Sequence, residues 1–391
     1  MRAPVALSAA TLAALAGSIA AAAHSGSPVR VRGIETTDTW AVLFLVLFAL
    51  AFAFYVAALV ALRSRRCTVA FVATVAVAIQ LTPLAGPLLI SRDVYSYWAY
   101  GRIVATHDQN PFTAAPARFP HDPATVVVSW RRQTSVYGPA FALASAGVAD
   151  VARQSVEVAS LSFRVIAAFA GIAATLLAAL IARRKAYAAA FVGWNPLVAL
   201  SFAGGGHNDA WMVVLLLGAL ALAARRRDVE AGALWIVAAA IKAPALLLLA
   251  LELFRSRRGL WLGAIAAAVI TAVASTAAFG TAWLTAGLHL AGREAKVGLP
   301  SRLEQIGLPD VLAHGLAYAA FAVGVVYLVR RARRGRPSIA LGASLFVITS
   351  PWVLPWYATW PVALAAVEDD IVAQGVALGL ALYLLPDRVP L

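Results

Sequence analysis

The stretch WAVLFLVLFALAFAFYVAALVAL, from Trp40 to Leu62, decides the fold class of this chain. It contains no charged residue and is long enough to cross the hydrocarbon core of a bilayer as one helix. Thr68–Ile90 repeats the pattern after an arginine block, and Leu260–Phe279 and Val311–Val329 repeat it later. Of 391 residues, 62% are hydrophobic and only 13% are charged, and the mean hydropathy is +0.81. Soluble domains are far more polar, so the sequence predicts an all-α integral membrane protein.

Positive charge is concentrated in short blocks at the ends of the apolar stretches, and the net charge is +14. The blocks are Arg63–Arg66, Arg183–Lys185, Arg225–Arg227, Arg255–Arg258 and Arg330–Arg336. Short loops rich in Lys and Arg remain on the cytoplasmic side of a membrane, so we place every block there. This distribution accounts for the net charge without a nucleic-acid partner.

Passing the apolar stretches alternately across the bilayer predicts a single polytopic domain over residues 1–391, with roughly ten to twelve transmembrane helices. Three segments then face outward: a loop at 91–135 with interfacial helices, a tight turn at 204–209, and a second loop at 280–310. We interpret Val5–Ala23 as the first span, and a cleaved signal peptide is the alternative. The predicted location is the plasma membrane.

Residues 229–254 do not fit a topology in which every apolar stretch crosses the membrane once. Arginine blocks flank this stretch on both sides, yet it contains only one apolar segment, which Lys242-Ala243-Pro244 interrupts. A proline cannot continue a helix without the loss of a hydrogen bond. We therefore predict a re-entrant hairpin of two half-length helices, whose irregular backbone is buried or lines a cavity. The alternative is one kinked span in which the Lys242 side chain extends to the surface.

The first outer loop holds the main candidate for chemistry. At helical spacing, Asp93, Tyr97 and Tyr100 share one face. The other face carries Tyr95, Trp98 and Arg102. Aromatic rings and an arginine suit a membrane interface, whereas a carboxylate at the rim of a membrane is costly unless it is used. Asp93 is therefore the predicted catalytic residue, and its alternative role is to cap the helix that starts there.

Further polar groups are predicted outside the membrane, against the usual distribution of charge. They are Asn110, Arg131 and Arg132 in the first outer loop, Tyr137 just after it, and Arg302 in the second loop. Cations on this side indicate an anionic partner. Lipid headgroups are one candidate, and a substrate phosphate, whose geometry arginine matches, is the other. We assign these residues, together with Tyr95, Tyr97 and Arg102 of the first loop, to substrate binding.

His207-Asn208-Asp209 is a second polar group, which follows glycines that allow a tight turn. Its side chains have the chemistry to bind sugar hydroxyls, and the alternative is that Asn208 or Asp209 caps the next helix. Asn195 and Lys242 lie within apolar stretches, where polar groups are functional by default. All five residues are candidates for substrate binding.

The sequence predicts neither a metal ion nor a cofactor. HExxH, paired DxD carboxylates and clustered histidines are missing, as are a Walker sequence and a dinucleotide-binding GxGxxG. The single cysteine, Cys67, has no partner for a disulfide or a zinc pair.

Several motifs together resemble one family. They occur in the order Asp93-Val-Tyr-Ser-Tyr, Asn110-Pro-Phe, Tyr137-Gly-Pro, Trp194-Asn-Pro, Gly205-Gly-His-Asn-Asp209, Lys242-Ala-Pro and Pro351-Trp-Val-Leu-Pro-Trp-Tyr357. The chain resembles the actinobacterial polyprenol-phosphate-mannose-dependent α-mannosyltransferases, membrane glycosyltransferases of the GT-C class. It is most similar to the α-1,6-mannosyltransferases of lipomannan synthesis, although enzymes that form α-1,2 bonds share the layout.

The resemblance implies that Asp93 is the base and that Trp356 and Tyr357 belong to the substrate site. Mannose would pass from polyprenyl-phosphate-mannose to a lipid-linked mannan or glycolipid on the outer face of the membrane. A single base with direct displacement inverts configuration, so a β-linked donor gives an α-product. The alternative function is a transporter or flippase, because broken helices with polar residues also occur in those proteins. A non-catalytic scaffold would leave the outer acidic and aromatic residues unexplained.

Overall fold

The computed structural model describes residues 2–27, 29, 38–65, 67–254, 258–290, 292–387 and 389. Arg66 and residues 255–257, which belong to two predicted arginine blocks, lie outside the described residues, as do residues 30–37 between the first two predicted spans. Within the described ranges all regular secondary structure is helical. This agrees with the predicted fold class.

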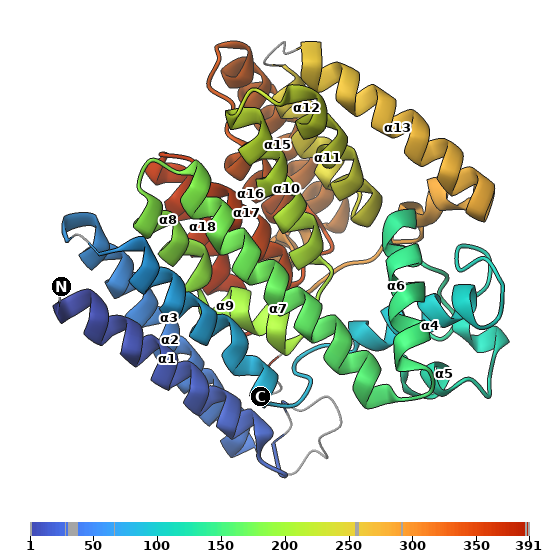
Figure 1. Ribbon diagram of the computed structural model, residues 1–391, viewed down its shortest axis with the longest axis horizontal. Helices are drawn as coiled ribbons and strands as arrows, with labels where there is room; N and C mark the ends of the chain where they lie inside the picture. Colours follow the sequence, from blue (N-terminus) through green and yellow to red (C-terminus); the bar gives the residue numbers. More distant parts are fainter. Residues whose placement is uncertain are drawn as a thin grey trace.

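The first three helices lie side by side at one edge of the molecule (Figure 1). α1 (Arg2–Ala23) packs against α2 (Asp38–Ser64), the helix that contains the apolar stretch that decides the fold class. α3 (Val69–Leu81) ends sooner than its apolar sequence predicts, and a 3₁₀ turn, η1 (Thr82–Ala85), follows it. Pro83 causes this ending, because its nitrogen has no hydrogen to donate to an α-helical bond.

The predicted interfacial helices form a separate cluster at the opposite edge (Figure 1). They are α4 (Asp93–Ala105), η2 (Pro116–Arg118), α5 (Pro123–Val127) and α6 (Pro139–Ala152). α4 crosses α6 at Gly101, where an added Cβ would lie 2.1 Å from the carbonyl oxygen of Ser145. Gly138, just before α6, donates its N–H to the carbonyl of Ile241 at 3.1 Å. The first outer loop is thereby joined to the break in the predicted hairpin.

The central helices contain a bend that the sequence analysis did not predict. α7 (Val156–Ile181) is one long span, but the next predicted span divides into α8 (Lys185–Gly193), α9 (Pro196–Ala199) and a π-helical turn, η3 (Leu200–Gly204). The segments before and after Trp194-Asn195 differ in direction by 51°. Pro196 breaks the hydrogen-bond ladder. α10 (Asp209–Ala224) then starts at the last residue of the predicted polar group His207-Asn208-Asp209.

Residues 228–253 form two short helices, α11 (Asp228–Ile241) and α12 (Ala245–Leu253), with the predicted break between them. The following helix, α13 (Arg258–Phe279), begins beside the start of α11. A Cβ on Gly259 would lie 2.9 Å from the Cβ of Asp228, and one on Gly263 would lie 1.8 Å from the carbonyl oxygen of Val229. The chain therefore enters and leaves this segment at the same end, as a hairpin requires. Its depth in a bilayer remains a prediction.

The last part of the chain completes the helical bundle. Its elements are η4 (Ala282–Leu290), α14 (Leu299–Gln305), α15 (Asp310–Arg333), α16 (Ile339–Thr349), η5 (Pro355–Ala358), α17 (Thr359–Ala365) and α18 (Ile371–Leu384). By length and composition five of the described helices can cross a membrane, or six if the bent pair is one span. Five more apolar helices have 10–17 residues. The chain is thus an all-α polytopic membrane protein, and the count of ten to twelve spans remains a prediction.

Arginines from different predicted blocks gather at one end of the bundle, here called the arginine end. Arg63 donates to Gln374 at 3.0 Å, Arg331 pairs with Asp370 at 2.7 Å, and the Arg333 guanidinium lies 5.4 Å from the ring centre of Phe254. The hairpin and α16 both start at this end. This grouping is what a common cytoplasmic location of the blocks requires.

Cysteines at Thr113 and Lys296, in a Cys67→Ala background, are expected to react with a membrane-impermeant thiol reagent in intact cells. Both positions are exposed and lie in the two predicted outer loops. A third cysteine at Arg183, at the arginine end, should react only after permeabilisation. The reverse labelling pattern would show that the predicted orientation is inverted.

Candidate active site

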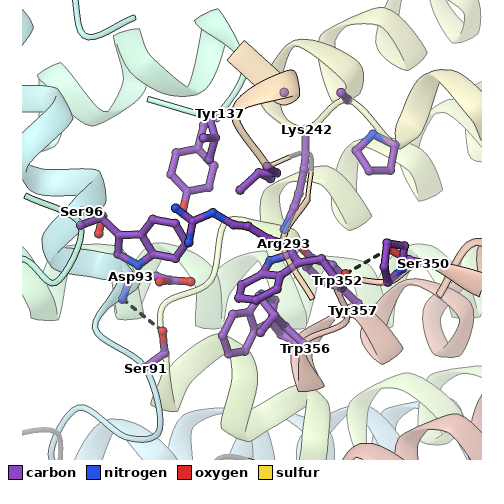
Figure 2. Close-up of a pocket in the computed structure, with 18 of the residues that line it drawn as sticks. Ser91, Asp93, Ser96, Tyr137, Lys242, Arg293, Ser350, Trp352, Trp356 and Tyr357 are labelled. Carbon is purple, nitrogen blue, oxygen red and sulfur yellow. Dashed lines mark hydrogen bonds between the residues drawn. The ribbon is translucent and has the colours of Figure 1, made fainter. Parts of the chain in front are cut away.

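A cavity of about 900 Å³ opens at the end of the bundle opposite the arginine end. The start of α4, the break between α11 and α12, and the segment after α16 each contribute side chains to its wall. Figure 2 shows Asp93, Tyr137, Lys242 and Arg293 around this space, with Trp356 beneath them. Residues far apart in the sequence therefore share one site.

Asp93 is the first residue of α4, and it lines the cavity with 17% of its side chain exposed. The N-cap position belongs to Arg92, whose side chain makes no capping bond. Instead, the N–H of Asp93 donates to Ser91 Oγ at 3.1 Å (Figure 2). The predicted alternative, an N-cap role for the Asp93 carboxylate, is therefore not what the structure contains. Its side chain lines the cavity.

His207 lies directly behind Asp93. Its Nδ1 is 3.6 Å from Asp93 Oδ2, and its ring stacks on Trp356 with centroids 3.6 Å apart. Only 1% of the residue is exposed, and Nδ1 has no hydrogen-bond partner in the described part of the chain. Gly206, at φ +66°, permits the turn that brings the imidazole here. The His207 ring thus lies against the Asp93 carboxylate and is itself held by the Trp356 ring.

The stability of the protein is expected to fall as the pH decreases through about 6.5, in part because of His207. Burial, and then the nearby Lys242 cation, lower the pKa of His207 well below 6.5. Below that pH the unfolded chain binds a proton that the folded chain does not, so acid favours unfolding. Thermal unfolding in detergent between pH 7.5 and 5 should show a weaker pH dependence for His207→Gln than for the wild type. An unchanged slope would contradict the buried, neutral imidazole.

The second carboxylate, Asp209, is fully buried and already neutralised. Lys242 Nζ lies 2.8 Å from both of its carboxylate oxygens, and the Trp360 indole donates to one of them. Lys242 occupies the hairpin break, and its ammonium group lies 4.6 Å from the ring centre of Tyr357. Of the predicted candidates, Lys242 and Tyr357 thus form the floor of the cavity, and Asp209 lies behind them as the partner of the Lys242 ammonium group.

Tyrosines of the first outer loop line the wall next to Asp93. The rings of Tyr97 and Tyr137 meet edge to face at 5.0 Å, and the Tyr97 hydroxyl donates to Asn208 at 3.4 Å. The Tyr100 hydroxyl donates to the carbonyl of Gln133 at 3.0 Å. Burial, with a smaller effect from Asp93, raises the pKa of Tyr100. These phenols therefore remain neutral donors.

The predicted phosphate-binding arginines do not reach the cavity. Arg131 and Arg132 are exposed, and Arg131 donates to a nearby carbonyl; Arg302 is exposed and donates to the Tyr383 hydroxyl at 2.8 Å. The cavity cations among the described residues are Arg92, Lys242 and Arg293. The spacing of arginines in a loop gives no information on which ones fold inward, and phosphate binding by these three residues remains a prediction.

Arg293 is the main residue that the sequence analysis missed. Its guanidinium lies 4.1 Å from the ring centre of Trp130 and donates to the Gln133 side chain at 3.2 Å. Trp130 and Trp352, which also line the cavity, meet edge to face at 6.5 Å. The only sequence signal for Arg293 was its place in the charged loop at 280–310.

Four predicted binding residues instead support the fold. Arg102 forms a buried ion pair with Asp122 at 2.8 Å, and Tyr95 is packed in the core. Asn110 accepts from the N–H of Phe112, and Asn195 caps α9 through the N–H groups of Leu197 and Val198. None of the four lines the cavity. Local hydrogen bonding of these polar groups explains their positions without a ligand.

The sequence is similar to those of known mannosyltransferases. Residues 5–255, well over half of the chain, match a family model described as "Alpha-(1->6)-mannopyranosyltransferase, N-terminal domain". The chain is 28% identical over 327 residues to Alpha-(1->6)-mannopyranosyltransferase A of Mycobacterium tuberculosis. This match covers 72% of this chain and 63% of the relative. It is 32% identical over 168 residues to the A protein of Corynebacterium glutamicum, covering 41% of this chain and 34% of that relative. The chain therefore spans less than two thirds of these relatives. No solved structure matches.

Proposed function

The chain belongs to the alpha-(1->6)-mannopyranosyltransferase family, and from this we propose that it transfers mannose from a polyprenyl-phosphate-mannose donor. The acceptor is a mannoside of a lipid-linked mannan or glycolipid. The reaction takes place in the cavity that Asp93 lines, on the outer face of the plasma membrane. The observation that carries this proposal is a partly exposed carboxylate that shares one cavity with two ordered cations, Lys242 and Arg293.

The chemistry needs a base and a means to stabilise the leaving group. Asp93 accepts the proton of an acceptor hydroxyl as that oxygen forms a bond to the anomeric carbon. The bond from this carbon to the phosphate oxygen breaks at the same time, and its electron pair remains on the phosphate. Arg293 and Lys242 stabilise the charge that develops there. Attack opposite the leaving group inverts the configuration, so a β-linked donor gives an α-linked mannoside.

Asp209 is a poor candidate for this base. Its two oxygens are held by Lys242, and its side chain is wholly buried, so an acceptor hydroxyl cannot approach it. The pair instead fixes the Lys242 ammonium at the floor of the cavity. Asp209 therefore holds a cation, whereas Asp93 lines the cavity, and this difference supports Asp93 as the base.

A lipid-linked donor suits the composition of the wall. Leu247, Leu290, Phe321 and Phe346 line the cavity beside the charged and aromatic residues. An apolar wall can receive the first isoprene units of the carrier, and burial of each CH₂ group contributes about 0.8 kcal/mol. The sequence contains no nucleotide-binding motif that would favour a soluble nucleotide sugar.

Arg293→Gln is expected to weaken donor binding by roughly 10–100-fold, the effect of one charge-assisted hydrogen bond to phosphate. The matched control is Arg302→Gln, which removes an equal charge from the same outer loop but outside the cavity. The dissociation constant of polyprenyl phosphate, measured by titration in detergent, distinguishes the two. Equal losses in both variants would mean that only net charge of the loop matters.

Donor choice tests the proposed function. Purified protein is incubated with an α-mannoside acceptor and either polyprenyl-phosphate-mannose or GDP-mannose, each labelled in the sugar. Labelled product is expected from the lipid donor only. Product from GDP-mannose, or label carried across liposomes without transfer, would overturn the proposal and favour a different enzyme or a transporter.

A further inference from the structure

A second cavity, remote from the candidate active site, lies at the arginine end of the bundle. It has a volume of about 420 Å³ and is formed between the ends of α2 and α7, the start of α8, and the turn between α17 and α18. Three arginines line it, Arg63, Arg183 and Arg184. The mannosyl-transfer mechanism uses none of these residues.

The back of this cavity is a buried polar network. Arg63 donates to the Tyr187 hydroxyl at 3.2 Å and to the Gln374 side chain at 3.0 Å, and Tyr187 donates to Gln374 at 3.2 Å. Tyr187 and Gln374 are each only 7% exposed. The network fixes the plane of the Arg63 guanidinium at the mouth of the cavity, so less conformational entropy is lost when an anion binds.

Arg183 and Arg184 complete the positive charge. Both are exposed, and neither side chain makes a hydrogen bond or an ion pair within the described part of the chain. They directly precede α8, whose first turn has no side-chain cap and so adds a small favourable potential for an anion.

Two carboxylates also line the cavity, but they do not cancel this charge. Glu368 accepts from Ser338 Oγ and from the N–H groups at the start of α16, so its charge is compensated there. Asp369 is exposed to solvent. The three arginines outnumber the two carboxylates, so the lining of the cavity carries a net positive charge.

The margin of the cavity is apolar. Val60 lies one helical turn before Arg63 and is 64% exposed, Leu180 lies three residues before Arg183 and is 49% exposed, and Ile371 on the cavity wall is 60% exposed. A free phosphate ion would gain nothing from such a margin. A molecule with an anionic head and hydrocarbon chains would use both parts.

We propose that this cavity binds the headgroup of an anionic diacyl phospholipid, with the phosphate on Arg63, Arg183 and Arg184 and the acyl chains along α2, α7 and α18. Basic pockets between membrane helices bind such headgroups in general. The site is separate from sugar transfer, so its test needs no substrate.

Binding is measured on the full-length protein in detergent, by native mass spectrometry and by the shift in unfolding temperature. The probes are phosphatidylglycerol, phosphatidylcholine and inorganic phosphate. Phosphatidylglycerol is expected to bind and to stabilise the protein, whereas the other two leave it unchanged. At about 1 kcal/mol per basic residue, Arg183→Gln combined with Arg184→Gln should weaken this binding about thirtyfold.

The matched control is Arg225→Gln combined with Arg226→Gln, which removes the same charge from exposed positions outside the cavity. This control should retain the affinity of the wild type. Equal affinity for both lipids, equal losses in the two double variants, or a full response to inorganic phosphate alone would each overturn the lipid site. Because binding is read directly, an inactive transferase would leave this result intact.

Discussion

Asp93→Asn is expected to lower the rate of mannosyl transfer by roughly 10²–10⁴-fold, which is the usual cost of removing a general base. Asn has nearly the same shape as Asp but cannot accept a proton. The N–H of residue 93 still donates to Ser91 Oγ, because that bond does not involve the side chain. The variant should therefore fold, survive detergent extraction and bind the lipid donor as the wild type does. Initial rates with saturating donor and acceptor measure the loss.

Asp150→Asn is the control for this experiment. It makes the same chemical change at an exposed position of α6 that does not line the cavity, so its rate should equal that of the wild type. Ser91→Ala is a second comparison, since a lost capping bond costs about 1 kcal/mol of stability and leaves the base in place. Near-normal turnover by Asp93→Asn would remove Asp93 from the mechanism.

Asp209→Asn is expected to destabilise the protein by about 3–5 kcal/mol, because it leaves the Lys242 ammonium without its buried partner. Both carboxylate oxygens now lie 2.8 Å from Lys242 Nζ. Adding Lys242→Met should recover much of the lost stability, since a pair of neutral side chains avoids the unpaired charge. Chemical or thermal unfolding of the two variants measures this recovery.

The double variant also separates stability from catalysis. Lys242 lines the cavity and is proposed to stabilise the leaving phosphate, so a stable Asp209→Asn/Lys242→Met protein should transfer sugar more slowly than the wild type. A single Asp209→Asn variant that is as stable as the wild type would contradict the buried ion pair. It would reopen the assignment of Asp209 as an alternative base.

The features that sequence predicted correctly are those that local chemistry dictates. The break in the hairpin follows from Pro244, which cannot continue a helix, and from arginines on both sides of a single apolar stretch. The position of Asp93 at the first turn of a helix follows from the polar segment before it. Lys242 was predicted to have a functional partner because burying an amine away from any partner is costly, and in the structure it lines the cavity.

The features that sequence missed depend on which side chains the tertiary fold brings together. Arg293 and Arg302 are equivalent charges in one loop, and only packing against Trp130 turns Arg293 inward. Asn195 was assigned to substrate binding because it lies in an apolar stretch, yet its partners are the amides of the next helical turn. Local polarity indicates that a residue has a partner but does not identify it.

We propose that the protein transfers mannose in this cavity from a lipid phosphate to an acceptor hydroxyl with inversion. The measurement that tests it most directly is the anomeric configuration of the product that purified protein forms from β-linked polyprenyl-phosphate-mannose and an α-mannoside acceptor. Nuclear magnetic resonance of the new linkage should show an α-mannoside from the wild type and almost no product from Asp93→Asn. A β-linked product, or equal yields from the two proteins, would contradict direct displacement assisted by Asp93.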